Sequence, residues 1–246
     1  MHEAPLQPTA SAAPRSTSAV APWWHTALIV LLIVGGSVFN SRPTHIGALS
    51  AHHMQRYLTG IGVEWLLFLL VWWGLRMKRV SLAEVFGFRR GLEAWGEDLA
   101  AAAIFWIISL AILACIGILA QLLHLTSPQK ALAALAPRNA QEVLLWITLS
   151  CTAGIVEELT FRGYLLRQFA APAHSLAVGV VASSLIFGIA HGYEGAAGML
   201  AIGVYGALFC ALALLRRSLR PGMIAHAWHD IFSGLMLALV HHFHLL

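Results

Sequence analysis

Residues 144–169 read LLWITLSCTAGIVEELTFRGYLLRQF and place two adjacent glutamates and an arginine inside an apolar run. A charged side chain at the centre of a bilayer costs roughly 3 kcal/mol on insertion scales, so such residues are rare and usually face a functional cavity. Glu157, Glu158 and Arg162 are therefore the first candidates for a functional site.

The overall composition is that of a membrane protein. Hydrophobic residues make up 59% of the chain and charged residues only 11%, with a mean hydropathy of +0.76. Soluble domains carry about 25% charged residues, so this chain could not cover a water-facing surface. The pI near 9.3 reflects basic residues at the ends of apolar runs, which flank membrane spans, and we expect membrane lipid and no nucleic acid as partner.

The apolar runs predict the fold class. A spanning helix needs about 20 mostly apolar residues, and the fifth of the candidate runs is short and interrupted by glycine. The sequence predicts an all-α, polytopic membrane helix bundle of about seven (six to eight) transmembrane helices. The candidate spans are Trp23–Phe39, Gly60–Leu75, Leu99–Leu123, Val143–Arg162, Val178–His191, Met199–Leu215 and Met223–Val240.

The chain divides into a tail and one membrane domain. Residues 1–21 are rich in Ala, Pro, Ser and Thr, which predicts a disordered N-terminal tail. Residues 22–246 form the predicted membrane domain, within which residues 142–235 carry the polar motifs. The first span is expected to serve as an uncleaved targeting signal.

The basic residues predict the orientation. Cytoplasmic loops carry an excess of Lys and Arg, which favours a cytoplasmic N terminus in a multi-pass membrane protein. We also expect residues 168–176 to form an interfacial turn around Pro172, with the site towards the cytoplasmic half. With seven spans, one side holds Arg15, Arg76, Lys78, Arg79, Arg89, Arg90, Arg162, Arg167, Arg216, Arg217 and Arg220, and the other holds Arg42, Arg56, Lys130 and Arg138.

Helical spacing separates the roles of the two glutamates. Glu158 and Arg162 are four residues apart and lie on one helix face, so they can form an ion pair. Glu157 points about 100° away from Glu158, so the two cannot face one cavity equally. We predict chemistry at Glu157 and an architectural pair of Glu158 with Arg162, although the whole cluster could equally be structural.

Two later segments add histidines in similar settings. His191 ends the sequence FGIAH, and His226 precedes Asp230 by one helical turn, which aims an imidazole and a carboxylate at one point. His229 lies on another face and is the weaker candidate. One polar group on each of several helices is how a bundle builds a site, so we expect these segments to converge.

Carboxylates and imidazoles together suit the activation of water. Such a set can take a proton from water and pass it to a leaving amine, while a second histidine stabilises an oxyanion. The same residue types can instead ligate zinc, which activates its bound water. The zinc motif H-E-x-x-H and the serine motif G-x-S-x-G are absent, so glutamate-activated and metal-activated water both stay open.

These motifs resemble those of a known family. Glu157-Glu158-x-x-x-Arg162, Phe187-x-x-x-His191 and His226-x-x-x-Asp230 are similar to the three motifs of the CAAX protease and bacteriocin-processing (CPBP, or Abi) family. This family comprises intramembrane endopeptidases related to type II CAAX prenyl proteases.

The resemblance implies a function and a role for each residue. It implies hydrolysis of a peptide bond in a membrane-associated protein or peptide, in a bacterial inner membrane. Glu157 and His191 would activate the water, His226 and Asp230 would stabilise the oxyanion, and Glu158 with Arg162 would support them. Position 230 is Asn in eukaryotic-type members, and an ionised Asp cannot donate a hydrogen bond. In the metal-dependent version, Glu157, His191, His226 and Asp230 would hold zinc; otherwise no cofactor is implied.

Two other functions remain open at this point. The chain could be a non-catalytic bacteriocin-immunity or maturation scaffold that binds a peptide. It could also be a proton-coupled transporter whose buried glutamates and histidines relay protons. The chain shows no inverted repeat and no matching pair of broken helices, which disfavours the transporter.

Overall fold

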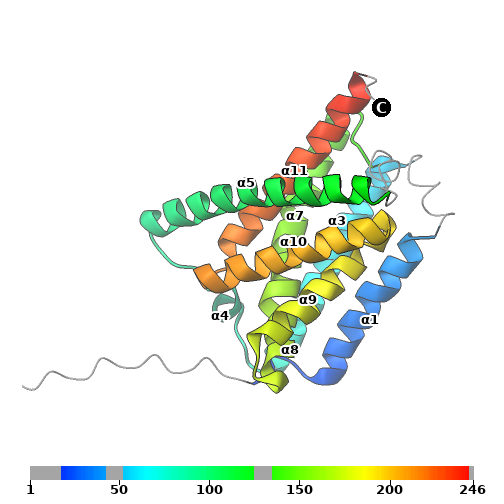
Figure 1. Ribbon diagram of the computed structural model, residues 1–246. Coiled ribbons are helices and arrows are strands. Elements are labelled where there is room, and N and C mark those ends of the chain that lie inside the picture. The colour runs from blue at the N-terminus through cyan, green and yellow to red at the C-terminus, as the bar shows by residue number, and fades with distance from the viewer. Residues whose placement is uncertain (1–17, 43–51, 125–134, 244–246) are drawn as a thin grey trace, which may run out of the picture.

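The computed structural model describes residues 18–42, 52–124 and 135–243, which form a bundle of helices (Figure 1). These three ranges contain no β-strand, so the predicted all-α fold class is confirmed. Residues 1–17 lie outside the described ranges, and the predicted disordered tail therefore stays a prediction.

The described elements follow one another along the chain with short connections. They are α1 (Trp23–Asn40), α3 (His53–Met77), α4 (Leu82–Phe86), α5 (Leu92–Leu122), α7 (Ala140–Glu157), the π-helix η1 (Glu158–Leu165), α8 (Leu166–Ala173), α9 (Leu176–Ala190), the 3-10 helix η2 (Gly192–Glu194), α10 (Gly195–Arg216) and α11 (Arg220–His242).

Six of the described helical segments are long and apolar enough to cross a membrane. The fifth predicted span corresponds to α9, which has only 15 residues. The fourth span is longer than predicted, because α7, η1 and α8 form one 34-residue helix from Ala140 to Ala173. Pro172 lies inside its last turn, so the turn predicted over residues 168–176 is wrong and shrinks to His174 and Ser175.

Local hydrogen bonds set where the central helix starts and stops. Asn139 caps α7, because its Oδ1 accepts from the backbone N–H of Glu142 at 2.9 Å. The Glu142 carboxylate accepts in return from Asn139 Nδ2 at 2.9 Å and from Arg138 N at 2.8 Å. The helix ends at His174, which adopts a left-handed conformation with φ of 47°. Ser175 then caps α9 by accepting from Val178 N.

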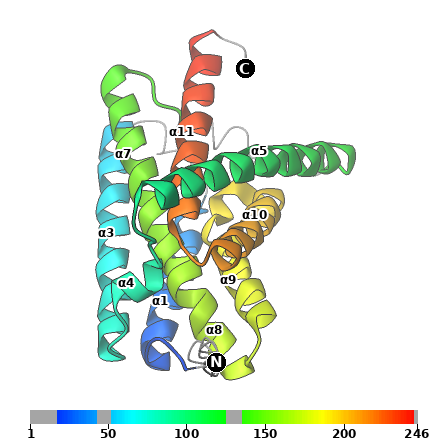
Figure 2. The same cartoon turned by 90° about the vertical axis from the view of Figure 1, so that its left-hand side faces the viewer.

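The long helices run in two directions. Helices α3, α7 and α11 stand side by side, with α1 and α9 beside them (Figures 1 and 2). Helices α5 and α10 lie across this group, as Figure 2 shows. Helix α5 has 31 residues and is about 46 Å long, more than the roughly 30 Å hydrocarbon thickness, so a steep tilt fits its length.

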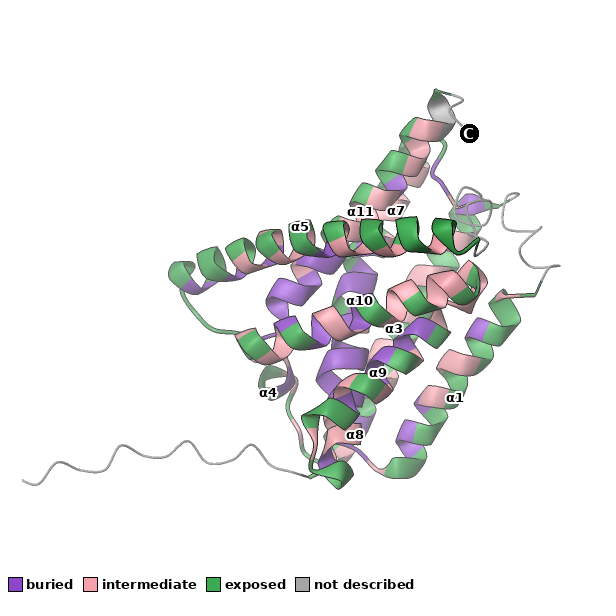
Figure 3. Cartoon of the chain, in the orientation of Figure 1, coloured by how far each residue is buried: buried purple, intermediate pink, exposed green. Residues whose placement is uncertain are grey.

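Burial is concentrated on the central helix. In the segment Ala140–Ala173, 44% of the most apolar window is buried, against 11% to 28% in the other five spans. The outer faces of the remaining helices are exposed (Figure 3) and carry large apolar side chains such as Leu31, Leu122 and Leu215. An apolar exterior around a partly polar interior is the pattern expected of a protein in lipid.

A second polar cluster joins the ends of three helices. Asp98, near the start of α5, is fully buried and accepts from Arg220 of α11 at 2.7 Å and from Arg216 of α10 at 3.0 Å. The Arg220 guanidinium also lies over the Trp95 ring, 4.1 Å from its centroid. Removing one partner from such a buried pair leaves an uncompensated charge.

We expect Asp98→Asn to lower the free energy of unfolding by about 3 kcal/mol, because the two arginines lose their buried counter-charge. Unfolding in mixed detergent micelles measures this change. Glu97→Gln is the matched control, since Glu97 contacts the same Arg216 but is exposed, and it should cost under about 1 kcal/mol. Equal effects of the two substitutions would contradict the structural role of Asp98.

Candidate active site

The two adjacent glutamates lie where the hydrogen-bond pattern of the central helix changes. Helix α7 ends at Glu157, and the π-helical segment η1 begins at Glu158. All eight residues of η1 are buried. π-Helical segments are rare and are frequently found at functional sites, which agrees with the position of this one. Apolar periodicity alone carries no signal for it.

Glu158 and Arg162 form the predicted ion pair. Arg162 Nη1 lies 3.0 Å from Glu158 Oε1, and neither side chain is exposed to solvent. The guanidinium donates to the carbonyl of Gly206 on α10 and lies 4.3 Å from the ring centroid of Phe187 on α9. It also lies 4.8 Å from the Phe209 ring. Cation–π contacts of this kind are strongest where water is excluded.

The His226 imidazole of α11 is surrounded by three carboxylates. Its Nδ1 lies 3.2 Å from Glu158 Oε1, which is already paired with Arg162. Its Nε2 lies 3.6 Å from Glu157 Oε2 and 3.7 Å from Asp230 Oδ2. The structure thus brings the first and third motifs together, and it turns the two glutamates towards different nitrogens of one ring.

Two glycines allow this close approach of α7 and α11. A Cβ atom added to Gly154 would lie 2.8 Å from the carbonyl oxygen of Met223, so any side chain there would push the helices apart. A Cβ atom on Gly222 would lie 2.7 Å from Glu158 Oε2. Small residues at helix interfaces let backbones approach in membrane proteins, and here they also leave room for a carboxylate.

His191 lies at the edge of this cluster. It is the residue after the last turn of α9, and its Nδ1 lies 2.9 Å from the carbonyl of Phe187. No ion pair joins it to Glu157, although both residues are described. It is close enough to act electrostatically on Asp230, as Glu157 also is. The second motif therefore borders the other two without direct contact to Glu157.

Sequence reasoning missed three residues near the site. Glu64 of α3 interacts electrostatically with Glu157, His226 and Asp230. Tyr193 and Glu194 follow His191 in η2, and Glu194 also acts on Asp230. Glu64 could have been found, because it is the one charged residue between Arg56 and Arg76 in an apolar run.

His229, the weaker histidine candidate, points elsewhere. Its ring packs against the Tyr205 ring with centroids 4.9 Å apart, and its Nδ1 is buried without a hydrogen-bond partner. It therefore lies on a different side of α11 from the carboxylates around His226.

The candidate zinc ligands do not form a ready-made metal site. Across residues 18–42, 52–124 and 135–243, no three side chains of His, Cys, Asp or Glu are placed to hold one metal ion. We therefore derive no step through zinc, and its binding by Glu157, His191, His226 and Asp230 stays a prediction.

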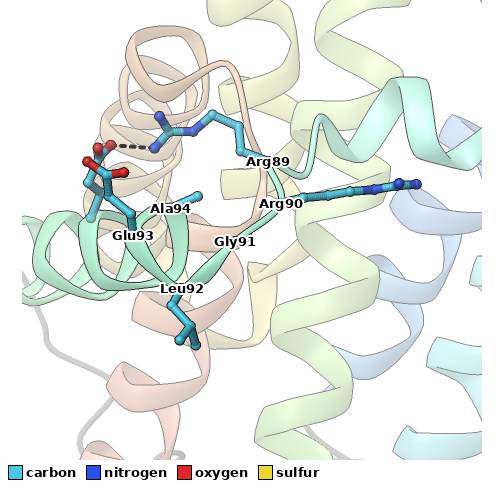
Figure 4. Close-up of a pocket in the computed structure, with 7 residues that line it drawn as sticks. Arg89, Arg90, Gly91, Leu92, Glu93 and Ala94 are labelled. Atoms are coloured by element: carbon cyan, nitrogen blue, oxygen red, sulfur yellow. Dashed lines mark hydrogen bonds and ion pairs between the residues drawn. The ribbon is translucent and has the colours of Figure 1, made fainter.

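A surface hollow of about 490 Å³ lies away from the three motifs (Figure 4). Its lining runs along residues 89–94 and Glu97, at the start of α5. Arg89 turns towards Glu97 and pairs with it at 2.5 Å, while Arg90 points away. No motif residue lines this hollow, so it does not define the candidate active site.

The fold and the site together define a polytopic membrane protein with carboxylates and imidazoles gathered inside its helix bundle. Residues 139–232 match the family model described as Type II CAAX prenyl endopeptidase Rce1-like. This range contains all three motifs, and the match confirms the resemblance predicted from them. It supports an intramembrane endopeptidase of the CAAX protease type. Neither the curated proteins nor the solved structures searched contained a match to the chain.

Arg162→Gln should destabilise the protein by about 3–5 kcal/mol, because it leaves Glu158 buried without its cation. Thermal unfolding in detergent, calibrated by denaturant unfolding, measures the change. Arg90→Gln serves as control, since Arg90 is exposed and should shift stability by less than about 0.5 kcal/mol. A stable Arg162→Gln variant would show that the pair is dispensable.

Proposed function

We propose that the protein is an intramembrane endopeptidase in which Glu157 and His191 activate a water molecule and His226, with Asp230, stabilises the oxyanion. The attacking water loses a proton to Glu157 as its oxygen adds to the scissile carbonyl carbon. The proton then passes to the leaving amine as the C–N bond breaks. The substrate is a membrane-associated protein or peptide.

The hydrogen bonding of His191 supports its part in this reaction. The Phe187 carbonyl can only accept a hydrogen bond, so the proton of a neutral His191 ring resides on Nδ1. Nε2 is then left with a free lone pair. An imidazole held in this tautomer can accept a hydrogen bond from water and orient it towards Glu157.

The surroundings of His226 support a role in charge stabilisation. Its Nδ1 donates to Glu158, whose carboxylate is held ionised by Arg162, and this fixes the ring. When the ring carries a second proton, Nε2–H can donate to a developing oxyanion. Asp230 Oδ2, at 3.7 Å from Nε2, would keep the ring oriented and would favour its charged form.

One observation carries the proposal. The Nε2 atom of His226 faces Glu157 and Asp230 together, at 3.6 and 3.7 Å. These distances are longer than a direct hydrogen bond, and a water molecule or a reacting group can bridge contacts of that length. A purely structural pair would be expected to close to hydrogen-bond distance.

The proposed setting follows from the charge pattern. A cytoplasmic N terminus places the basic ends of α3, α8 and α10 in the cytoplasm, and the site would open towards that half of a bacterial inner membrane. Glu157 lies near the middle of the 34-residue helix Ala140–Ala173, well inside the membrane.

Glu157→Gln should lower the cleavage rate of a fluorogenic peptide library at least about 100-fold, because the amide keeps the shape but cannot accept the proton. The purified full-length protein in detergent micelles is assayed against Glu93→Gln, an exposed glutamate at the start of α5. Glu93→Gln should cleave at the wild-type rate. Unchanged cleavage by Glu157→Gln would refute the proposed role.

Chelation separates the two ways of activating water. If Glu157 and His191 act without a metal, cleavage by the wild-type protein should survive dialysis against a zinc chelator. Loss of cleavage on chelation, with recovery on adding zinc, would instead assign Glu157, His191, His226 and Asp230 as metal ligands. Rates are measured on the same peptides before and after each treatment.

A further inference from the structure

Glu64 lies on the face of α3 that packs against the central helix. Tyr57 and Gly60 share this face, being seven and four residues earlier. The Tyr57 ring lies 5.6 Å from the Trp146 ring of α7, and a Cβ atom on Gly60 would lie 3.2 Å from Leu149. The carboxylate of Glu64 is therefore directed into the bundle, towards the candidate active site.

This carboxylate has no partner of opposite charge. Its Oε2 atom is shielded from solvent and makes no hydrogen bond, and no ion pair to it occurs within the described ranges. Its charged neighbours are Glu157, His226 and Asp230, so two of the three repel it. A buried acceptor without a donor is costly and calls for an explanation.

Nothing in the surrounding helices neutralises this excess of negative charge. Glu158 has Arg162, and Asp98 has Arg220, whereas Glu64 shares the single imidazole of His226 with Glu157 and Asp230. Glu157 Oε2 is likewise buried without a hydrogen-bond donor. Two adjacent carboxylate oxygens thus lack a donor, and an incoming cationic group would supply one.

We propose that Glu64 is a specificity-determining residue that receives a basic side chain, lysine or arginine, of the substrate beside the scissile bond. This inference rests on the proposed endopeptidase function. The apolar stem of such a side chain can pack along the bundle wall while its charged head reaches the carboxylate. Asp230, with 31% of its side chain exposed, and Glu157, with 15%, mark the side from which the substrate enters.

Other readings of Glu64 fit the structure less well. A metal ion would need at least three converging ligands, and the described residues offer no such group. A positioning role would need contact with Glu157 or His226, yet Glu64 makes no hydrogen bond to either. A substrate cation needs one carboxylate in an acidic setting, which is what Glu64 provides.

The test uses pairs of peptides that differ at one position. A cleaved peptide from the library is resynthesised with lysine or its uncharged isostere norleucine at each of the three positions on either side of the bond. For the wild-type protein, kcat/KM should favour lysine over norleucine at one position by about tenfold or more. In Glu64→Gln this ratio should fall to near one, and Glu64→Asp, which keeps the charge, should restore most of it.

Each outcome separates substrate recognition from other roles. Glu93→Gln should keep the wild-type ratio. A wild-type ratio of one at every position, or equal losses on both peptides in Glu64→Gln, would overturn the proposal. The wild-type ratio and the Glu64→Asp variant still decide the matter if Glu64→Gln does not fold.

A binding assay distinguishes failure of this proposal from failure of the proposed function. If the wild-type protein cleaves no peptide, the endopeptidase function fails, and the same peptide pairs are then measured for affinity by fluorescence anisotropy. Tighter binding of the lysine peptide by wild type than by Glu64→Gln would still support the subsite. Equal affinities would overturn it.

Discussion

The ion pair between Glu158 and Arg162 is the interaction on which the rest of the site depends. It lies in an apolar interior where neither charge could exist alone, so each residue requires the other. From this pair, contacts reach three further helices: Phe187 on α9, Gly206 on α10 and His226 on α11. The four helices are therefore registered against one buried charge pair, and the site residues inherit their positions from it.

The pair also explains why two glutamates stand next to each other. Because Glu158 is occupied by Arg162 and by Nδ1 of His226, it is not free to react. Glu157 is turned to Nε2 of the same ring and keeps an oxygen without a hydrogen-bond partner. A single imidazole thus connects a carboxylate that is fully satisfied with one that is not, and this asymmetry suits one for support and the other for chemistry.

Much of the architecture could be predicted, because lipid imposes simple rules on length and polarity. The spans, and the pairing of Glu158 with Arg162, follow from apolar runs and from helical spacing. The π-helical segment could not, because it depends on packing between helices rather than on local sequence. The continuation of the central helix through Pro172 escaped prediction because tertiary contacts outweighed a local turn signal. Glu64 was missed because it lies in a helix distant in sequence from every motif.

The shortness of α9 has a consequence for how an imidazole can reach the bilayer interior. Fifteen residues extend only about 22 Å, so the helix ends at membrane depth, where its last peptide groups find no water. Ser37 of α1 supplies what lipid cannot: its hydroxyl donates to the carbonyl of Ile189 and accepts from the N–H of Gly192. The depth and direction of His191 are thus fixed by counting residues, and a serine on a separate helix makes that early ending tolerable.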